Sequence, residues 1–344
     1  MLLKSRHGVH PFCAIPSECQ GPNTMHNEAS DMSSLSIVPA YKESTVSKPY
    51  PGPSNALSVD VEDYFQVEAF AGQISFSDWP AFPSRVRQNT ERVLGLFERH
   101  NVKGTFFILG WVAERQPGLV RQIAAAGHEI ACHSYAHRQV FRMTPTAFRD
   151  DVRRAKRAIE DAAGSPVYGY RAPTFSILRR SLWALDILAE EGFLYDSSIF
   201  PVRHDLYGFP EAPRQMHRRE AGHYRSIIEL PMSTVSLLGH NLPVGGGGWL
   251  RVLPLAYTKW AIRRLHAAGT PLVVYFHPWE LDPQQPRIPG RWKSQLRHYT
   301  GLRRMERRLD SLLSSFCFLP ILEMIRTTTN NDCLPEPSPS SSLT

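Results

Sequence analysis

The chain has 344 residues, of which 42% are hydrophobic, and a formal net charge of +7 at pH 7. That length allows one large domain or two ordinary ones. The positive charge alone does not indicate a nucleic-acid-binding protein, because the sequence has no zinc-finger or RNP-like motif. The five cysteines are odd in number, three of them lie near the chain ends and no CxxC occurs, which argues against a disulfide framework or a cysteine zinc site.

The two ends of the chain differ in composition from the middle. Residues 1–54 mix Ser, Pro, His, Asn and Gly without a sustained apolar period, and residues 326–344 are rich in Thr, Asn, Pro and Ser. Such segments lack the apolar surface that offsets the entropy of ordering, so we predict that both are disordered. The remaining residues, 55–325, have the size of a single α/β barrel domain.

No secretory or membrane-spanning segment is recognisable. The N-terminal residues include a basic residue but no apolar stretch of the signal-peptide type. No run approaches the roughly 18 apolar residues that a transmembrane helix needs. We therefore expect a cytoplasmic protein, with peripheral association with a membrane as an alternative.

Short apolar strands alternate with amphipathic helices along 55–325. Strands are predicted where β-branched or aromatic runs are bounded by Gly or Pro, and helices where apolar residues recur with helical spacing. In chain order we expect a strand at 56–60, a helix at 83–100, a strand at 104–109, a helix at 117–127, a strand at 128–132, a helix at 144–164, a strand at 167–171, a helix near 179–191, strands at 193–196 and 227–231, a helix at 254–268, a strand at 271–277 and a helix at 300–314. This alternation predicts a parallel sheet, either closed as a barrel or left open.

Much of the positive charge lies in residues 291–313. Basic residues there alternate with Leu302, Met305, Leu309 and Leu312, whose spacing is helical. We expect a helix with one basic, solvated face. A patch that meets a polyanion, such as an acidic polysaccharide or a nucleic acid, is the alternative, although no motif supports nucleic acid as a partner.

Chemically active residues follow the predicted strands. In α/β barrels such residues gather at the carboxyl ends of the strands. Here those ends carry acids, histidines and one arginine, namely Asp60, Glu62, Asp63, His133, His137, Arg171, Asp196 and His277. Each one alone has an ordinary structural explanation, such as a helix cap, a surface ion pair or a loop histidine. Their occurrence at several strand ends together favours a functional site.

This set of residues fits metal-assisted hydrolysis. Two neutral imidazoles and one carboxylate can hold a divalent ion while leaving positions open for water and substrate. A second carboxylate can take a proton from water, and His277 can protonate the leaving group from the opposite side. Arg171 would keep a nearby carboxylate ionised.

The segments that carry these residues resemble a known family. SVDVED, KGTFFILG, GHEIACHSYAHR, YRAPTF, YDSS and VVYFHPWE are similar to the NodB-homology polysaccharide deacetylases, carbohydrate esterase family 4, over roughly 55–280. Two later segments, SIIELPMSTVSLLGHNLPVGGGGWLR and LRHYTGLRRMERRL, resemble the subfamily found with exosortase and exopolysaccharide gene clusters. The domain at 55–325 would then include a subfamily-specific region at about 280–325.

The resemblance implies a distorted (β/α) barrel that removes acetyl groups from N-acetylated sugars in a polymer. It implies a divalent ion, zinc with cobalt as an alternative, held by His133 and His137. Asp60 is implied as the catalytic base and His277 as the catalytic acid. The remaining implied residues are Arg171, which would hold the base, and Asp196, which would tune His277.

The chain departs from the family pattern at three places. The run Asp60-Val61-Glu62-Asp63 replaces two adjacent aspartates, so the third metal ligand is Glu62, which strand alternation favours, or Asp63. Thr174 stands where an aromatic residue is usual, and Phe175 follows it. Pro278 follows His277 where many members have an acid. Candidate residues for the oxyanion and the substrate are Thr174, Phe175 and Trp279.

We expect an N-deacetylase acting on an exopolysaccharide or its lipid-linked oligosaccharide precursor, with no nucleic-acid partner. One alternative is a metal-independent hydrolase of a small cyclic amide or imide, as some relatives with this fold are. Another is a catalytically silent carbohydrate-binding barrel. The glycines at 245–248 are expected to form a flexible loop, because no GK[ST] of a phosphate-binding loop follows them.

Overall fold

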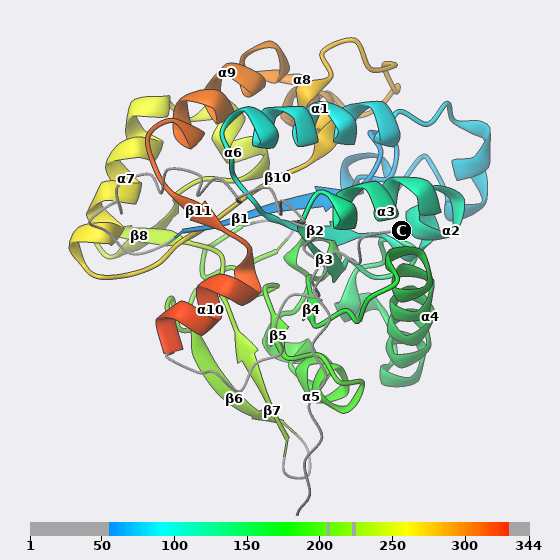
Figure 1. Cartoon of the computed structure of the whole chain (residues 1–344), viewed down its shortest axis with the longest axis horizontal. Helices are drawn as coiled ribbons and strands as arrows, with labels where there is room; N and C mark the ends of the chain where they lie inside the picture. The colour runs from blue at the N-terminus through cyan, green and yellow to red at the C-terminus, as the bar shows by residue number, and fades with distance from the viewer. Residues whose placement is uncertain (1–54, 205–206, 222–224, 330–344) are drawn as a thin grey trace, which may run out of the picture. The chain divides into compact units, whose positions relative to one another are not determined.

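A mostly parallel β-sheet surrounded by helices forms the centre of the fold in the computed structural model (Figure 1). The structure describes residues 55–204, 207–221 and 225–329. The disorder predicted for 1–54, and for 330–344 of the C-terminal segment, concerns residues outside this range. Within the described ranges, no helix is long and apolar enough to cross a membrane.

The elements have the following bounds. The strands are β1 (Asn55–Val61), β2 (Thr105–Ile108), β3 (Glu129–Cys132), β4 (Gly169–Tyr170), β5 (Tyr195–Asp196), β6 (His217–Ala221), β7 (Arg225–Glu229), β8 (Thr234–Leu237), β9 (His240–Pro243), β10 (Val273–Phe276) and β11 (Phe318–Leu319). The α-helices are α1 (Val86–Arg99), α2 (Gly110–Arg115), α3 (Pro117–Ala125), α4 (Pro145–Ala163), α5 (Trp183–Glu190), α6 (Gly247–Val252), α7 (Leu255–Ala267), α8 (Trp292–Tyr299), α9 (Leu302–Leu313) and α10 (Ile321–Thr329). The short 3-10 helices are η1 (Glu68–Phe70), η2 (Phe76–Ala81), η3 (Val140–Arg142), η4 (Pro173–Phe175), η5 (Arg179–Ser181) and η6 (Pro278–Leu281).

The main sheet has the strand order β10-β1-β2-β3-β4-β5-β7-β6, and β11 also pairs with β1. Every pairing in it is parallel except that of β6 with β7, and β8 and β9 form a separate antiparallel hairpin. All seven predicted strands are therefore present. Strand β6 was missed because its sequence, HRREA, has no apolar run and joins the sheet only through pairing with β7.

Alternate residues of each strand face opposite sides of the sheet. Leu57 and Val59 of β1 pack outward in a cluster with the apolar faces of the surrounding helices α1, α3, α4 and α5. Ala56 belongs to a second buried cluster, to which Phe107 of β2 and Tyr275 of β10 also contribute. Because members of this second cluster come from strands along the whole sheet, the sheet curves around it and encloses an interior.

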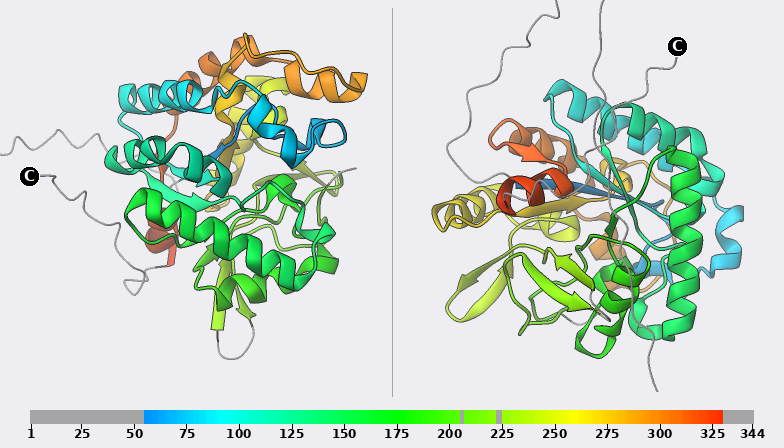
Figure 2. Two further views of the ribbon diagram at one scale, coloured as in Figure 1. Left: turned by 90° about the vertical axis from the view of Figure 1, so that its right-hand side faces the viewer. Right: turned by 60° about the horizontal axis from the view of Figure 1, so that its bottom comes forward.

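Helix α10 closes this interior at the amino ends of the strands. The ribbon views show this helix beside the sheet (Figure 2), and its residues Ile321 and Leu322 belong to the inner cluster. The Ile321 N–H donates to Thr105 Oγ1 at 2.7 Å, and the Leu322 N–H donates to a carboxylate oxygen of Glu129 at 3.0 Å. Helix α10 extends to Thr329, so the first residues of the predicted C-terminal tail, 326–344, are instead helical.

The barrel closes between β10 and the chain that follows β7, and these two segments do not pair as strands. The chain beyond β7 reaches β10 at Ser233, whose hydroxyl accepts a hydrogen bond from the Val273 N–H at 2.7 Å. A single side-chain bond thus takes the place of a strand ladder at this junction. The expectation of a distorted (β/α) barrel is confirmed.

The glycine run at 245–248 was predicted to form a flexible loop. Its second half is helical instead, because Gly247 starts helix α6. Gly246 has a φ of 147°, and a Cβ added there would lie 2.1 Å from ring atoms of Tyr275. Glycine is required at this position because the backbone approaches the inner aromatic cluster closely.

Gly169 in β4 makes a similar close approach and allows a stability test. A Cβ at this position would lie 2.1 Å from Cζ and Oη of Tyr195, and the Tyr195 hydroxyl donates to Glu129 at 2.7 Å. We predict that Gly169→Ala lowers the free energy of unfolding by about 2 kcal/mol or more, because the ring must move and its hydrogen bond is lost. Urea denaturation measures this change.

Gly72→Ala is the matched control, because a Cβ at Gly72 has nothing within 4 Å. It should change the free energy of unfolding by less than about 0.5 kcal/mol. Equal effects of the two substitutions would contradict the packing assigned to Tyr195.

Candidate metal centre and active site

The carboxyl ends of the parallel strands meet at the open end of the barrel, opposite α10. Asp60 ends β1, the segment after β3 carries the two histidines, and His277 follows β10. The structure brings together most of the residues that the sequence singles out, namely Asp60, Glu62, His133, His137, Arg171, His277 and Trp279.

A buried ion pair between Arg171 and Asp60 forms the floor of this site. Nη1 of Arg171 donates to Asp60 Oδ1 at 2.7 Å and to Ser58 Oγ at 2.8 Å, and its Nε donates to the Ser197 carbonyl at 3.1 Å. Arg171 has no exposed surface, and its guanidinium lies 4.1 Å from the centre of the Phe107 ring. With Oδ1 held by Arg171, Asp60 Oδ2 faces His277 Nε2 at 3.9 Å.

Glu62, His133 and His137 form a compact group of potential metal ligands. One nitrogen or oxygen atom from each lies within 4.8 Å of the others, and the described residues contain no second group of this kind. Glu62 Oε2 lies 2.8 Å from His137 Nε2, yet it is buried and has no hydrogen-bond partner of acceptable geometry. An orphaned carboxylate oxygen beside two imidazoles fits the requirements of a divalent cation.

The orientation of His133 leaves one ring nitrogen free for a ligand. Its Nδ1 lies 2.8 Å from the Arg171 carbonyl oxygen, so Nδ1–H donates to this carbonyl and the Nε2 lone pair faces the site. Burial, with some help from the neighbouring His137, lowers the pKa of His133 to about 4. The ring is therefore neutral at pH 7, which is the form that binds metals.

A turn rather than a helix brings His137 back to His133. Ser134 and His137 both have positive φ angles, 65° and 52°, and the two imidazole centroids are 5.4 Å apart. Such φ values are unfavourable for residues other than glycine. The strain is consistent with a functional constraint on the position of the second imidazole.

Asp63, the other candidate for the third ligand, has a different environment. Its carboxylate accepts hydrogen bonds from Ser84 Oγ at 2.7 Å, from the Arg85 N–H at 2.9 Å and from the Val86 N–H at 3.1 Å. Val86 is the first residue of α1, so Asp63 caps this helix from a distant part of the chain. Its oxygens are occupied, whereas Glu62 Oε2 is not.

His277 is held by a carboxylate that the sequence reasoning missed. Its Nδ1 lies 2.6 Å from Glu280 Oε1, and Glu280 Oε2 accepts a hydrogen bond from Arg251 Nε at 2.5 Å. Burial alone would lower the pKa of His277, but the charge of Glu62, the hydrogen bond to Glu280 and the charge of Asp60 outweigh burial and raise it to about 9. The ring is therefore protonated at pH 7.

Asp196, expected to tune His277, points away from it. Its neighbour Tyr195 faces the interior, so strand alternation directs the Asp196 side chain outward, where its carboxylate accepts from the Ser198 hydroxyl at 2.5 Å. No contact between Asp196 and His277 occurs in the described part of the chain. The signal for Glu280 was its spacing, three residues after His277 in HPWE, which η6 converts into a side-chain contact.

Trp279, Phe175 and Thr174, the candidate residues for the oxyanion and the substrate, differ in burial and in their contacts. Trp279 is 4% exposed, stacks on His277 with a 5.2 Å centroid distance and donates from Nε1 to Glu62 Oε1 at 3.2 Å. Phe175 is buried against Tyr275 in the inner cluster. Thr174, with a φ of 56°, is the one that remains partly exposed, and its backbone N–H has no hydrogen-bond acceptor among the described residues.

Two family models match the chain. Residues 73–190 match the family described as polysaccharide deacetylase, and residues 197–326 match a domain of unknown function (DUF3473). The first range contains Arg171 and both histidines of the potential metal centre, His133 and His137. The second range contains His277 with Arg251 and Glu280. Strand β1, which carries Asp60, precedes both ranges.

Curated relatives include deacetylases. The chain is 26% identical over 170 residues to a peptidoglycan-N-acetylglucosamine deacetylase of Bacillus cereus, covering 45% of this chain and 58% of that protein. It is 34% identical over 100 residues to a chitooligosaccharide deacetylase of Bradyrhizobium sp., covering 29% of this chain and 43% of that protein. The chain thus spans about half the length of these relatives.

Solved structures share the fold. A protein from Mycobacterium smegmatis assigned as a polysaccharide deacetylase has a TM-score of 0.56 at 23% identity, covering 85% of this chain and 97% of its own. The Puue allantoinase has a TM-score of 0.55 at 16% identity, covering 83% of this chain and 94% of its own. Because the fold is common to proteins named for different reactions, the side chains of the site must decide the chemistry.

The identity of the third ligand can be tested by zinc affinity. We predict that Glu62→Gln raises the Kd for zinc on the order of 100-fold, because an amide oxygen is a weaker ligand than a carboxylate. Asp63→Asn should leave the Kd within about threefold, while lowering the free energy of unfolding by about 1–3 kcal/mol through the weakened cap of α1. Competition with a chromogenic chelator measures the Kd, and the reverse ranking of the two variants would show that Asp63 is the ligand.

Proposed function

We propose that the chain is a metal-dependent N-deacetylase. The family match and the curated relatives support its membership of the polysaccharide deacetylase family. Its substrate would be a polysaccharide that contains N-acetylhexosamine. The observation that carries the proposal is the group formed by Glu62, His133 and His137, with Asp60 and His277 beside it. A binding module would not need a potential metal centre adjoining both an acid and a base.

The protonation states of Glu62 and His133 suit a divalent cation. Burial alone would raise the pKa of Glu62, but the charges of His137 and His277 and the contact with His137 outweigh it and lower this pKa to about 2. A neutral His133 and an ionised Glu62 are thus present at neutral pH. Two imidazole nitrogens and one carboxylate oxygen form a ligand set of catalytic zinc sites, and cobalt is the alternative. When bound, the ion would polarise the acetamide carbonyl and lower the pKa of a bound water.

The base and the acid would act on the two sides of the reacting amide. Asp60 Oδ2 accepts the proton of the attacking water, while Arg171 keeps Oδ1 fixed. His277 Nε2–H donates its proton to the amide nitrogen as the carbon–nitrogen bond breaks, which releases acetate and an amino sugar. The Thr174 backbone N–H is the candidate donor to the oxyanion formed by the carbonyl oxygen.

Trp279 would support this chemistry indirectly. Its ring stacks on His277, and its Nε1–H donates to the oxygen of Glu62 that does not face His137. It therefore orients an acid and a ligand together rather than contacting a sugar. We further propose an exopolysaccharide, or its lipid-linked precursor, as the polymer, and a place in an exosortase-associated system. This finer assignment is supported by the later segments that resemble that subfamily.

Metal removal gives the main test of the proposed reaction. With an N-acetylglucosamine oligomer as substrate, acetate release should fall at least about 100-fold after exhaustive chelation and return on addition of zinc or cobalt. Acetate is measured enzymatically, and Asp60→Asn serves as a metal-binding but inactive control. Chelation-insensitive turnover, or turnover of a cyclic amide in place of the oligomer, would refute the proposal in favour of the metal-independent alternative.

Glu280 should act as a positioning residue for His277, with a signature in the pH profile. We predict that Glu280→Gln lowers kcat on the order of 100-fold. The protonated form of His277 is the active acid, so activity is lost as pH rises through its pKa. Loss of the Glu280 charge lowers that pKa, and the alkaline limb of the kcat/KM profile should move to lower pH.

Asp196→Asn is the matched substitution for this comparison, because it too replaces a buried carboxylate by an amide. It should leave the alkaline limb in place. A shift of that limb in Asp196→Asn but not in Glu280→Gln would restore the role that the family resemblance assigned to Asp196.

A further inference from the structure

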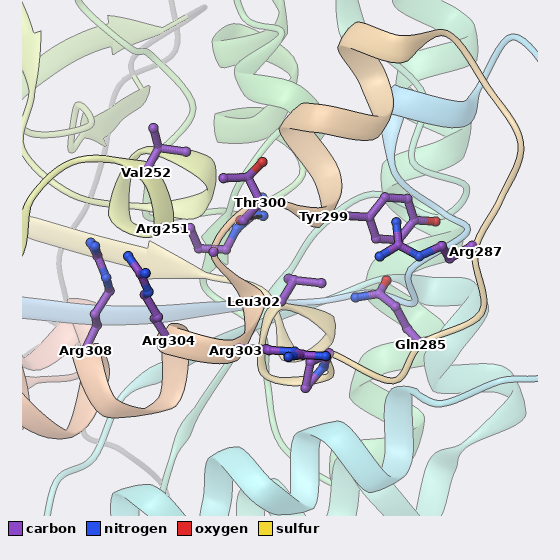
Figure 3. A pocket seen from close by; sticks show the side chains of 12 residues that line it. Arg251, Val252, Gln285, Arg287, Tyr299, Thr300, Leu302, Arg303, Arg304 and Arg308 are labelled. Atoms are coloured by element: carbon purple, nitrogen blue, oxygen red, sulfur yellow. Dashed lines mark hydrogen bonds between the residues drawn. The ribbon is translucent and has the colours of Figure 1, made fainter.

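A strongly basic cavity lies beside the proposed active site, in the part of the chain that carries the basic segment 291–313. Its volume is about 440 Å³, and it opens between α6, the segment at 283–287 and the start of α9 (Figure 3). Five of its lining residues are arginines and none is acidic, namely Arg251, Arg287, Arg303, Arg304 and Arg308. Helix α9 has the expected basic, exposed face, and Arg303 and Arg304 of that face also line this cavity.

Three of these arginines have no anionic partner. The side chains of Arg287, Arg303 and Arg304 are exposed. None of these three guanidinium groups makes an ion pair or donates a hydrogen bond within the described residues. Arg287 lies over the ring of Tyr299, with its guanidinium carbon 4.7 Å from the ring centroid. The acidic Glu306 of α9 contacts arginines of α1 instead and does not line the cavity.

The fold holds two of the positive charges next to each other. Arg308 donates from Nη1 to the carbonyl oxygens of Leu250, at 2.8 Å, and Leu253, at 2.5 Å. Arg304 lies one turn earlier on α9, and the two side chains extend side by side (Figure 3). Burial and the charge of Arg304 both lower the pKa of Arg308, as expected where like charges are held together. An anion between them would relieve this repulsion.

The backbone at the start of α9 adds to the positive potential. Gly301, with a φ of 82°, precedes the helix without a side-chain cap, and the first turn contains no acidic residue. The N–H groups of Leu302 and Arg303 have no acceptor among the residues that the structure describes. Their partial positive charge reinforces that of the arginine side chains.

We propose that this cavity binds a phosphate or diphosphate group. Arginine guanidinium groups bind phosphate oxygens in a bidentate manner, and a cavity of this volume can also hold a sugar attached to the phosphate. Arg251 forms the inner wall and donates to Glu280, so the bound group would lie close to the residues that hold His277. The inference goes beyond the proposed deacetylation, because an anion can bind here whether or not the centre hydrolyses amides.

Calorimetric titration of the full-length protein with inorganic pyrophosphate tests this proposal. At an ionic strength of about 0.15 M, which screens non-specific attraction between exposed charges, we expect saturable binding of one pyrophosphate per chain. Arg303→Gln and Arg304→Gln should each weaken binding about tenfold, since each removes a charge-assisted hydrogen bond. Arg307→Gln removes the same charge from α9 outside the cavity and should weaken binding less than about twofold.

The proposal is overturned if the wild-type protein shows no saturable binding, or if Arg307→Gln weakens binding as much as Arg304→Gln. Binding that is unaffected by Arg303→Gln and Arg304→Gln would also overturn it, because pyrophosphate would then occupy another site, such as a metal at Glu62. Parallel titrations with N-acetylglucosamine 1-phosphate and with inorganic phosphate distinguish the sources of the group. Tighter binding than that of inorganic phosphate indicates a sugar phosphate, and equal binding indicates the free anion.

Discussion

The buried guanidinium of Arg171 is the constraint on which the geometry of the site depends. Its side chain fixes Asp60 through one oxygen, and its carbonyl accepts the Nδ1–H of His133, so one residue positions both the proposed base and a proposed metal ligand. A fully buried charge is tolerated only when its partners satisfy it, and here Ser58 and Ser197 complete the set. Base and ligand therefore cannot shift independently.

A second arginine, Arg251, supports the proposed catalytic acid, His277, through a carboxylate. Arg251 holds Glu280, and Glu280 holds His277, in the same way that Arg171 holds Asp60. The two arginines come from distant parts of the chain, one after β4 and the other in α6. The C-terminal third of the sequence is thus not an accessory to the site, because it supplies the proposed acid, the carboxylate that orients it and the wall of the adjoining basic cavity.

The sequence predicted those features that follow from local pattern. Apolar runs located the seven parallel strands, and the polar residues after them, such as Asp60 and His277, marked the end of the barrel where they meet. Contacts made across the fold were not predictable in this way. The role of Asp63 depends on residues 84–86, and the outward direction of Asp196 depends on which face of β5 is buried. Helix α10 closes the barrel and continues to Thr329, into residues whose composition resembled a tail.

The central claim is that Glu62, His133 and His137 share one catalytic cation beside Asp60. Anomalous diffraction at the zinc edge, from crystals of the zinc-loaded protein, tests it most directly. The account predicts one peak about 2.0–2.2 Å from Glu62 Oε2, His133 Nε2 and His137 Nε2, with further positions open to solvent. A peak bound by Asp63 instead of Glu62, or no peak at this end of the barrel in zinc-saturated crystals, would contradict it.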